Sequence, residues 1–292
     1  MINKPIFIIG TSRSGTTILY NFLAVHPDVC WFSTISNAFP HVPQLAVIYK
    51  LLDVPFFGTL LKLHIMKTSK ESDMILGPHE GPTIYDDLCG FTNARITTEH
   101  DKTDYLEKKL KAIIAEHLRA TGRSRFLNKK PENIQRIRLL NAIFPNAYFV
   151  HIIRDGRAVA NSLLKSYWWP DAELWWLNGL RSKDWDAQGR DPIELCALHW
   201  RHNVQEVFRN KQLLRSRYIE VRYESLVQDV RGTISPILTF CGLRQDKKHL
   251  ALLPSRLPNM NYKWRKDLSP KQQAIVCRVL HKQLVKLQYE QE

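Results

Sequence analysis

Apolar and polar positions along the chain follow two alternating periods. Four apolar runs have the length and composition of buried strands: residues 5–9, 125–128, 148–153 and 218–221. Apolar side chains at helical spacing follow three of these runs, at residues 16–25, 134–143 and 158–164. Strands that alternate with helices in this way predict an α/β fold with a doubly wound, mainly parallel sheet and right-handed crossovers.

The C-terminal part of the chain carries a complete helix-start signal. Ser269 supplies an N-cap hydroxyl, and Pro270 suits the first helical position. Gln272 completes a capping box before an amphipathic run. The sequence therefore predicts a C-terminal helix that begins at Pro270.

Two regions interrupt the alternation of strands and helices. Residues 35–90 are rich in proline and aromatic residues and are poorly periodic, and residues 167–190 contain five of the eight tryptophans. No repeat or low-complexity linker divides the chain. We therefore expect a single domain over residues 1–292, with the two regions as insertions that form a helical lid.

Composition and charge narrow the classes of partner. The chain of 292 residues is 44% hydrophobic and 24% charged, which is typical of a folded domain. Its 42 Lys and Arg residues exceed its 28 Asp and Glu residues, so the formal net charge is +14. This excess favours an anionic partner, and three classes remain open: nucleic acid, an anionic membrane surface and a small, multiply charged substrate.

Cysteine usage and hydropathy indicate the setting. The five cysteines lie far apart without a CxxC pair, so we expect neither a zinc site nor a disulfide framework. The N-terminal apolar run is too short for a signal peptide. Residues 45–65 are interrupted by Lys50, Asp53 and Lys62 and do not qualify as a transmembrane helix. A reducing, cytoplasmic setting is therefore expected.

Residues 10–17 (GTSRSGTT) have the GxxxxG spacing of a phosphate-binding loop between a strand and a helix. Glycines let the backbone wrap closely, and its N–H groups face an anion together with the helix N-terminus. A nucleoside triphosphatase would carry Lys at position 16, but Thr16 stands there and the cation, Arg13, lies inside the loop. This departure argues against ATP or GTP hydrolysis. A P-loop kinase or NTPase and a non-enzymatic, basic nucleotide- or nucleic-acid-binding protein remain as alternatives.

Several blocks, in the same order along the chain, resemble one family. Residues 5–29 (PIFIIGTSRSGTTILYNFLAVHPDV) are similar to the 5′-phosphosulfate loop of sulfotransferases that use 3′-phosphoadenosine-5′-phosphosulfate (PAPS). Residues 149–164 (FVHIIRDGRAVANSLL) resemble the family's 3′-phosphate segment. Three further blocks are similar: residues 127–131 (LNKKP), 222–227 (RYESLV) and 261–269 (NYKWRKDLS). The chain is thus identified as a member of the PAPS-dependent sulfotransferase family, of the bacterial type.

This resemblance implies a donor, a product and a set of site residues. PAPS would donate the sulfuryl group and leave as adenosine 3′,5′-bisphosphate (PAP), without a metal, by in-line displacement as in phosphoryl transfer. Arg13 and Lys129 would act on the leaving oxygen and the sulfonate, although Lys130 is an equal claimant on spacing alone. The resemblance assigns these further residues to the donor: Ser12, Ser14, Gly15, Thr16, Thr17, Arg154, Ser162, Tyr223, Lys263, Arg265 and Lys266.

A general base must accept the proton of the attacking hydroxyl. The peptide-tyrosine enzymes of the family carry Glu shortly after the segment that corresponds to residues 26–29, and this chain does not, which weakens a peptide-tyrosine acceptor. Bacterial members have a later Pro-x-Glu segment, which Glu80 fits. His79 is the alternative base, because imidazole titrates near neutral pH, and His41 is a more remote one.

The acceptor is not identified by the sequence. The tryptophans of residues 167–185 could stack on a sugar face, line an apolar cleft or pack the lid onto the body. Residues 45–65 could touch a membrane, although core or homo-oligomer packing is favoured. Recognisable RNA-binding modules are absent, so we expect a small-molecule, carbohydrate or lipid acceptor and no nucleic acid.

Overall fold

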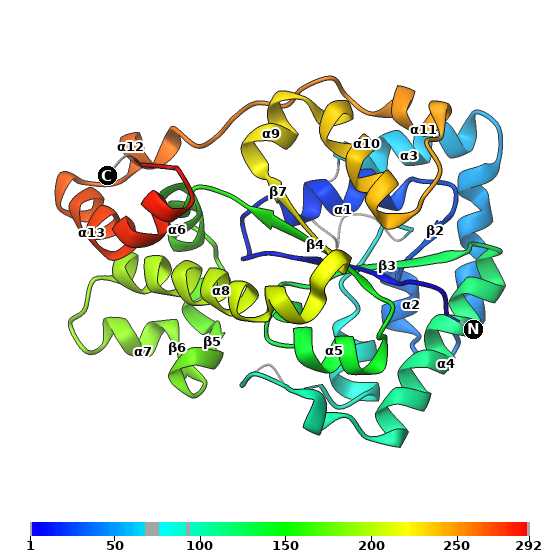
Figure 1. The fold of residues 1–292 in the computed structure, drawn as a ribbon, viewed down its shortest axis with the longest axis horizontal. Coiled ribbons are helices and arrows are strands. Elements are labelled where there is room, and N and C mark those ends of the chain that lie inside the picture. The colour runs from blue at the N-terminus through cyan, green and yellow to red at the C-terminus, as the bar shows by residue number, and fades with distance from the viewer. Residues whose placement is uncertain (1, 68–75, 92–93, 291–292) are drawn as a thin grey trace.

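A five-stranded parallel sheet forms the centre of the protein (Figure 1). The structure is a computed structural model that describes residues 2–67, 76–91 and 94–290. The strands are β1 (Ile6–Ile9), β2 (Val29–Cys30), β3 (Arg125–Lys129), β4 (Tyr148–Ile153) and β7 (Tyr218–Arg222). Their order across the sheet is β2-β3-β1-β4-β7, and every pairing is parallel. The four predicted strands and the α/β class are confirmed, whereas the two-residue strand β2 was not predicted.

Helices cover both faces of this sheet, as a doubly wound fold requires (Figure 1). The α-helices outside the two insertions are α1 (Thr16–Ala24), α4 (Asp104–Thr121), α5 (Ile137–Ile143), α6 (Gly156–Leu164), α8 (Pro192–Leu214), α9 (Tyr223–Gln228), α10 (Val230–Cys241), α11 (Lys247–Leu252), α12 (Lys263–Asp267) and α13 (Pro270–Lys286). Shorter 3-10 helices lie at Glu99–Asp101, Pro131–Ile134 and Arg215–Arg217.

Alternate side chains of β1 pack in two separate hydrophobic cores. Ile6 and Ile8 pack in a cluster with α1, α9 and α10. Phe7 and Ile9 pack in a second cluster with α4 and α5. Because successive residues of a strand point to opposite faces, the continuous apolar run of β1 reflects burial on both sides.

A third core joins α6, α8 and α13 at one end of the molecule (Figure 1). Ser269 caps α13, and Gln272 returns the second hydrogen bond of the capping box, as the sequence predicts. The longest helix, α8, starts with Asp191 as N-cap and Pro192 in its first turn. The buried Trp200 of α8 lies against Gly156, where a Cβ atom would approach its ring to 2.7 Å. This close approach sets α8 against the start of α6.

The described part of the first insertion, residues 35–90, contains short helices, and residues 68–75 of this region lie outside the described residues. These helices are α2 (Thr34–Ala38), a 3-10 helix (Pro43–Asp53), α3 (Phe57–Lys67) and a π-helix (Thr83–Leu88). The favoured core packing holds for part of this insertion, because Ala46, Tyr49 and Ile65 are buried in the core. Other apolar side chains of the same segment lie exposed at the surface.

The second insertion forms a small antiparallel hairpin and helices. Its elements are the 3-10 helices Trp169–Asp171 and Trp175–Leu177, strands β5 (Glu173–Leu174) and β6 (Leu180–Arg181), and α7 (Ser182–Asp186). Its tryptophans pack on histidines of α8: the ring of Trp176 stacks 4.2 Å from that of His202, and Trp169 meets His199 edge-on at 5.2 Å. The lid function of both insertions stays a prediction.

Two buried histidines make the stability of the fold depend on pH. Burial lowers the pKa of His151 from 6.5 to about 3 and that of His249 to about 4. Tyr218 Oη lies 2.7 Å from His151 Nδ1, and the Phe22 carbonyl oxygen lies 2.8 Å from His249 Nε2. Since both pKa values are lower in the folded state, the unfolded chain binds more protons below pH 6.5, and stability is lost as pH falls through this window.

We expect the free energy of unfolding to fall by about 2–3 kcal/mol per histidine between pH 7 and roughly pH 4.5. Urea denaturation at both pH values measures this loss. His249→Gln keeps an N–H donor for the Phe22 carbonyl but cannot titrate, so it should remove about half of the contribution of the two histidines. An unchanged pH dependence in this variant would contradict the role of His249.

Candidate active site

The loop after β1 has the backbone shape of an anion site. Arg13 and Gly15 both have positive φ, 72° and 94°, and the Ser14 N–H donates to the Thr11 carbonyl oxygen at 3.0 Å. A Cβ atom at Gly10 would meet the Ile152 carbonyl oxygen at 2.7 Å. Gly15 is the N-cap of α1 and offers no side chain to its first turn. The first N–H groups of α1 are therefore directed to the loop without a side-chain cap, which is the arrangement that binds phosphate.

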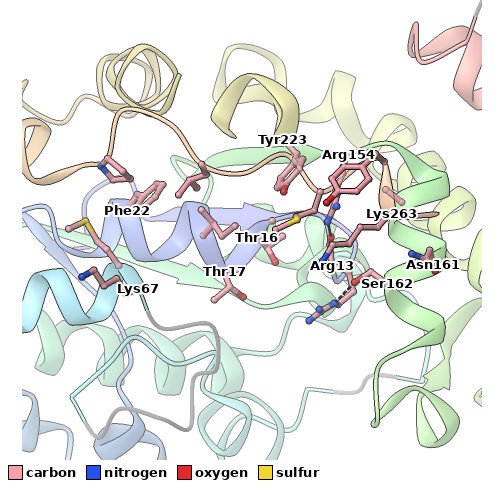
Figure 2. A pocket seen from close by; sticks show the side chains of 18 of the residues that line it. Arg13, Thr16, Thr17, Phe22, Lys67, Arg154, Asn161, Ser162, Tyr223 and Lys263 are labelled. Atoms are coloured by element: carbon pink, nitrogen blue, oxygen red, sulfur yellow. Dashed lines mark hydrogen bonds between the residues drawn. The ribbon is translucent and has the colours of Figure 1, made fainter. Parts of the chain in front are cut away.

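Two arginines join this loop to α6 and to the segment after α11. The Arg13 Nε donates to Ser162 Oγ at 2.9 Å, and Figure 2 shows this bond as a dashed line. Arg154 Nη1 donates to the Arg13 carbonyl oxygen at 2.9 Å, and Arg154 Nε donates to Asn261 Oδ1 at 2.8 Å. The structure thus brings Arg13 together with Arg154 and Ser162, which belong to another sequence block.

Arg154 is 8% exposed, and burial lowers the pKa of its guanidinium. An arginine keeps its charge under such conditions. It does not pair with the adjacent Asp155, because the Asp155 carboxylate binds Arg157 at 2.8 Å. Within the part of the chain that the structure describes, Nη2 of Arg154 makes no hydrogen bond. Arg154 therefore provides a positive charge in a fixed position, and its Nη2 group can donate to a ligand.

Tyr223 forms one wall of the site, at the start of α9. Its ring lies 4.2 Å from the guanidinium carbon of Arg154. A Cβ atom at Gly15 would meet Tyr223 Cδ2 at 2.7 Å, so only glycine fits beneath the ring. The close contact fixes the loop against the C-terminal end of β7, where an open parallel sheet places its ligand.

A cavity of about 1100 Å³ opens beside these groups (Figure 2). Its cationic side chains come from four elements: Arg13, Arg154, Lys165, Lys263 and Lys266, with Lys67 at the opposite end. Gly15, Thr16, Thr17, Ser162 and Tyr223 also line it. Phe22, Leu63 and Met66 make an apolar end. The cavity therefore combines an anion-binding end with an apolar one.

Three residues assigned to the donor lie elsewhere. Ser14 is buried within the loop, with its N–H bonded to Thr11. Arg265 lies 5.3 Å over the ring of Trp264 and does not line the cavity. Ser12 lines a separate cavity of about 300 Å³. Positions 263 and 266 share a face of α12, so Lys263 and Lys266 line the larger cavity, whereas Arg265 points away from it.

The smaller cavity lies between the loop and the tryptophan-rich insertion. Trp168, Trp169 and Trp175 line it, together with Ser12 and Glu132. Ser12 faces this cavity and the next residue of the loop, Arg13, faces the larger one. The loop therefore separates two cavities. The tryptophans pack on α8, as one of the three interpretations expects, and they also border a cleft that polar side chains line with them. Stacking on a sugar face stays a prediction.

The two adjacent lysines at the end of β3 have different partners. The Lys129 ammonium forms an ion pair with the Glu80 carboxylate, and Asn128 Nδ2 donates to the Glu80 carbonyl oxygen at 3.1 Å. The Lys130 Nζ lies 2.9 Å from Asp86 Oδ2. Lys129 and the first candidate base are thus held together at the carboxyl end of the sheet.

Asp86 is shared by two buried cations. Its second carboxylate oxygen lies 3.0 Å from Arg136 Nη2, and both Lys130 and Arg136 have almost no exposed side-chain surface. This three-residue network ties the π-helix to the segment after β3. Lys130 is therefore a structural cation, and the geometry separates it from Lys129.

Both the backbone and the ring of His79 form hydrogen bonds with neighbouring backbone groups. The backbone N–H of His79 donates to the Phe32 carbonyl oxygen at 2.7 Å, and its ring Nδ1 accepts from the Gly81 N–H at 3.1 Å. Burial lowers the pKa of His79. A neutral imidazole has one accepting nitrogen, and in His79 the Gly81 N–H occupies it. The geometry favours Glu80 over His79 as the base. His41 lies in an exposed position outside both cavities.

Sequence reasoning missed several residues of the larger cavity. Asn261 orients Arg154 and in turn donates to Glu224 Oε1 at 2.5 Å. Asn161 and Lys165 bind the carboxylate of Asp267, at 2.8 and 2.7 Å, and so hold α12 against α6. Lys165 follows Ser162 by three residues, a spacing that places both on one face of a helix. That spacing could have indicated Lys165.

Two features of the described residues concern metal ligands and membrane-spanning helices. Within residues 2–67, 76–91 and 94–290, no group of three or more His, Cys, Asp or Glu side chains could hold a metal ion. In the same ranges no single helix has the length and hydropathy of a membrane span, and only the bent pair Pro43–Asp53 and Phe57–Lys67 passes on length and composition together.

An α/β fold with a phosphate-binding loop and a cationic cavity defines the class of protein. The family model described as "Sulfotransferase family" matches residues 5–247. The chain therefore belongs to the sulfotransferase family. This membership favours sulfuryl transfer over the kinase or NTPase and the non-enzymatic alternatives.

Relatives of known name support the same family. The protein-tyrosine sulfotransferase of Drosophila melanogaster is 26% identical over 239 residues, which cover 80% of this chain and 37% of that protein. The omega-hydroxy-beta-dihydromenaquinone-9 sulfotransferase Stf3 of Mycobacterium bovis is 24% identical over 301 residues, covering 94% and 72%. The chain thus spans a little over a third of the length of the Drosophila protein.

Solved structures share the fold. Sulfotransferase STF9 from Mycobacterium avium matches with a TM-score of 0.61 at 16% identity, over 98% of this chain and 77% of that one. Sulfotransferase STF1 from Mycobacterium tuberculosis matches with a TM-score of 0.55 at 16% identity, over 86% and 71%.

Proposed function

We propose that this sulfotransferase uses PAPS as its donor and transfers the sulfuryl group to a hydroxyl of a small-molecule, carbohydrate or lipid acceptor. One observation carries the donor: the phosphate loop and the Arg154–Ser162 pair supply two sets of anion-binding groups to one cavity. PAPS has two separate anionic groups on one ribose, whereas a nucleoside triphosphate has a single chain of phosphates. A cavity with two anion sites fits the former.

The residues present fit this donor. The N–H groups at the start of α1 would hold the 5′-phosphate, and Arg154 and Ser162 the 3′-phosphate, with Lys263 and Lys266 as further cations. The ring of Tyr223 and the apolar end of the cavity would take the adenine. Arg13 borders the same cavity from the loop and supplies a permanent charge near the leaving phosphate.

Transfer is an in-line displacement at sulfur. The acceptor oxygen forms a bond to sulfur as the bond from sulfur to the 5′-phosphate oxygen breaks, and PAP leaves with the bonding electron pair. The acceptor proton passes to the Glu80 carboxylate. Lys129, held beside Glu80, stabilises the negative charge that develops on the leaving oxygen.

The smaller cavity is the proposed acceptor site. It lies on the other side of the loop from the larger cavity, since Ser12 and Arg13 are consecutive. Its tryptophans and carboxylates suit a ring or chain that also carries hydroxyls. The relative Stf3 bears the name of an enzyme for a hydroxylated menaquinone, which makes a lipid-like acceptor a reasonable first test.

The two lysines test the mechanism, with PAP release from PAPS as the assay and a phenol, a monosaccharide and a long-chain alcohol as acceptors. Lys129→Met should lower kcat with the best acceptor about a hundredfold to a thousandfold, because it removes charge at the leaving oxygen. Lys130→Met should instead cost about 1–3 kcal/mol of stability, because a cation of the Asp86 network is lost, and leave kcat near the parent value. The reverse pattern would overturn the assignment of Lys129.

A further inference from the structure

Exposed apolar side chains are concentrated in one segment of the chain. Of the twelve large hydrophobic side chains that are exposed in the described part of the chain, eight lie between residues 39 and 60. They are Phe39, Val42, Leu45, Val47, Val54, Phe56, Phe57 and Leu60, which we call the 39–60 face. Scattered exposed hydrophobics are ordinary, but a concentration of this kind marks an interaction surface.

The backbone forms a corner within the 39–60 face. The 3-10 helix Pro43–Asp53 and α3 meet at 110°, and Phe56 stands between them with its side chain 79% exposed. Phe56 has a positive φ of 62°, which is costly for an aromatic residue. The inner sides of both helices are anchored, since Tyr49, Leu52 and Ile65 belong to the core. The protein therefore keeps the Phe56 ring exposed to solvent at an unfavourable φ value, and neither feature stabilises the fold.

Within residues 39–67, the segment that carries the 39–60 face, the charged side chains are mainly positive. Lys50 and Lys67 are exposed, and Lys62 is half-buried. Asp53 is the only acidic residue between positions 39 and 67, and its carboxylate is paired with Arg123 at 2.8 Å. An apolar corner with a cationic rim is complementary to a bilayer that contains anionic lipids. A second copy of this chain, at a net charge of +14, would instead bring cation against cation.

We infer that the 39–60 face docks the protein on the surface of an anionic lipid bilayer, with Phe56 and its apolar neighbours in the interface and the lysines against the headgroups. The same helix that carries Phe57 and Leu60 reaches the larger cavity with Leu63, Met66 and Lys67. Docking therefore places the bilayer beside an element of the active site. The inference concerns binding to lipid and stands apart from the proposed donor.

Co-sedimentation of the full chain with vesicles tests the inference. Vesicles of phosphatidylglycerol and phosphatidylcholine in equal parts should sediment the protein, and pure phosphatidylcholine vesicles should bind it much less. The double variant Phe56→Asn/Leu60→Gln should bind the mixed vesicles about tenfold or more weakly, because it removes apolar area from the interface. Asn suits the positive φ at position 56, and Gln is a good helix former, so the fold should be kept.

The matched control is Leu213→Gln, which removes an exposed leucine of α8 outside the 39–60 face. It should bind the mixed vesicles like the parent, and circular dichroism with thermal unfolding checks that both variants are folded. Equal binding of the parent and the folded double variant would overturn the inference. So would a parent chain that ignores vesicles and forms a dimer in analytical ultracentrifugation that the double variant abolishes, since that result makes the face a contact between copies.

Discussion

Glu80→Gln should lower the rate of sulfuryl transfer about a hundredfold to ten-thousandfold while leaving the affinity for PAP close to that of the parent. The amide keeps the size of the side chain but cannot accept the acceptor proton at neutral pH. It also loses the ion pair with Lys129, yet Glu80 does not line the cavity assigned to the donor. Release of PAP from PAPS, measured with the best hydroxyl acceptor, gives the rate, and calorimetry with PAP gives the affinity.

His79→Asn is the matched control for the base. His79 Nδ1 accepts the Gly81 N–H, and the amide oxygen of asparagine stands at the same distance from the backbone and can take over that bond, so we expect turnover within about threefold of the parent. If Glu80→Gln retains turnover and His79→Asn loses it, the base is His79. Separate measurement of binding matters here, because a merely structural effect would move affinity and rate together.

Arg154→Ala should weaken PAP binding by about a hundredfold or more. Its guanidinium borders the cavity, is nearly buried, and is held toward the loop by Asn261 and the Arg13 carbonyl oxygen. Removing a buried charge that pairs with a ligand anion costs affinity in this range. The same titration with Arg265→Ala should change the affinity by less than about threefold, because Arg265 lies over Trp264 and outside the cavity lining.

The contrast between these two arginines separates specific binding from attraction by net charge. Both variants lower the formal charge of the chain by one. Equal loss of affinity in both would show that PAP responds to the overall positive field, and the assignment of Arg154 to the 3′-phosphate would then be wrong.

Much of the central architecture could be predicted because the signals are local. The runs at β1, β3, β4 and β7 are apolar and bounded by polar or turn residues, as strands buried on both faces are. The capping pattern at Ser269 gave the start of α13. α8 was not predicted, although Asp191 and Pro192 carry a helix-start signal of the same kind.

Long-range geometry of the site could not be predicted in the same way. The sequence could not rank Lys129 against Lys130, because adjacent strand residues point to opposite faces and only the folded chain shows which face holds Glu80. The bond between Arg13 and Ser162 spans 149 positions. For residues 45–65 the sequence left membrane contact open and favoured core or homo-oligomer packing, since an apolar run looks alike whether it is buried or at the surface.

Isothermal titration calorimetry of the full chain with PAP asks directly whether the protein binds the product of PAPS, because it requires no acceptor. We expect a dissociation constant in the micromolar range or tighter, and weaker binding of ATP, which lacks a 3′-phosphate for Arg154 and Ser162. The absence of heat at millimolar PAP, in protein that unfolds cooperatively, would contradict the use of PAPS as donor.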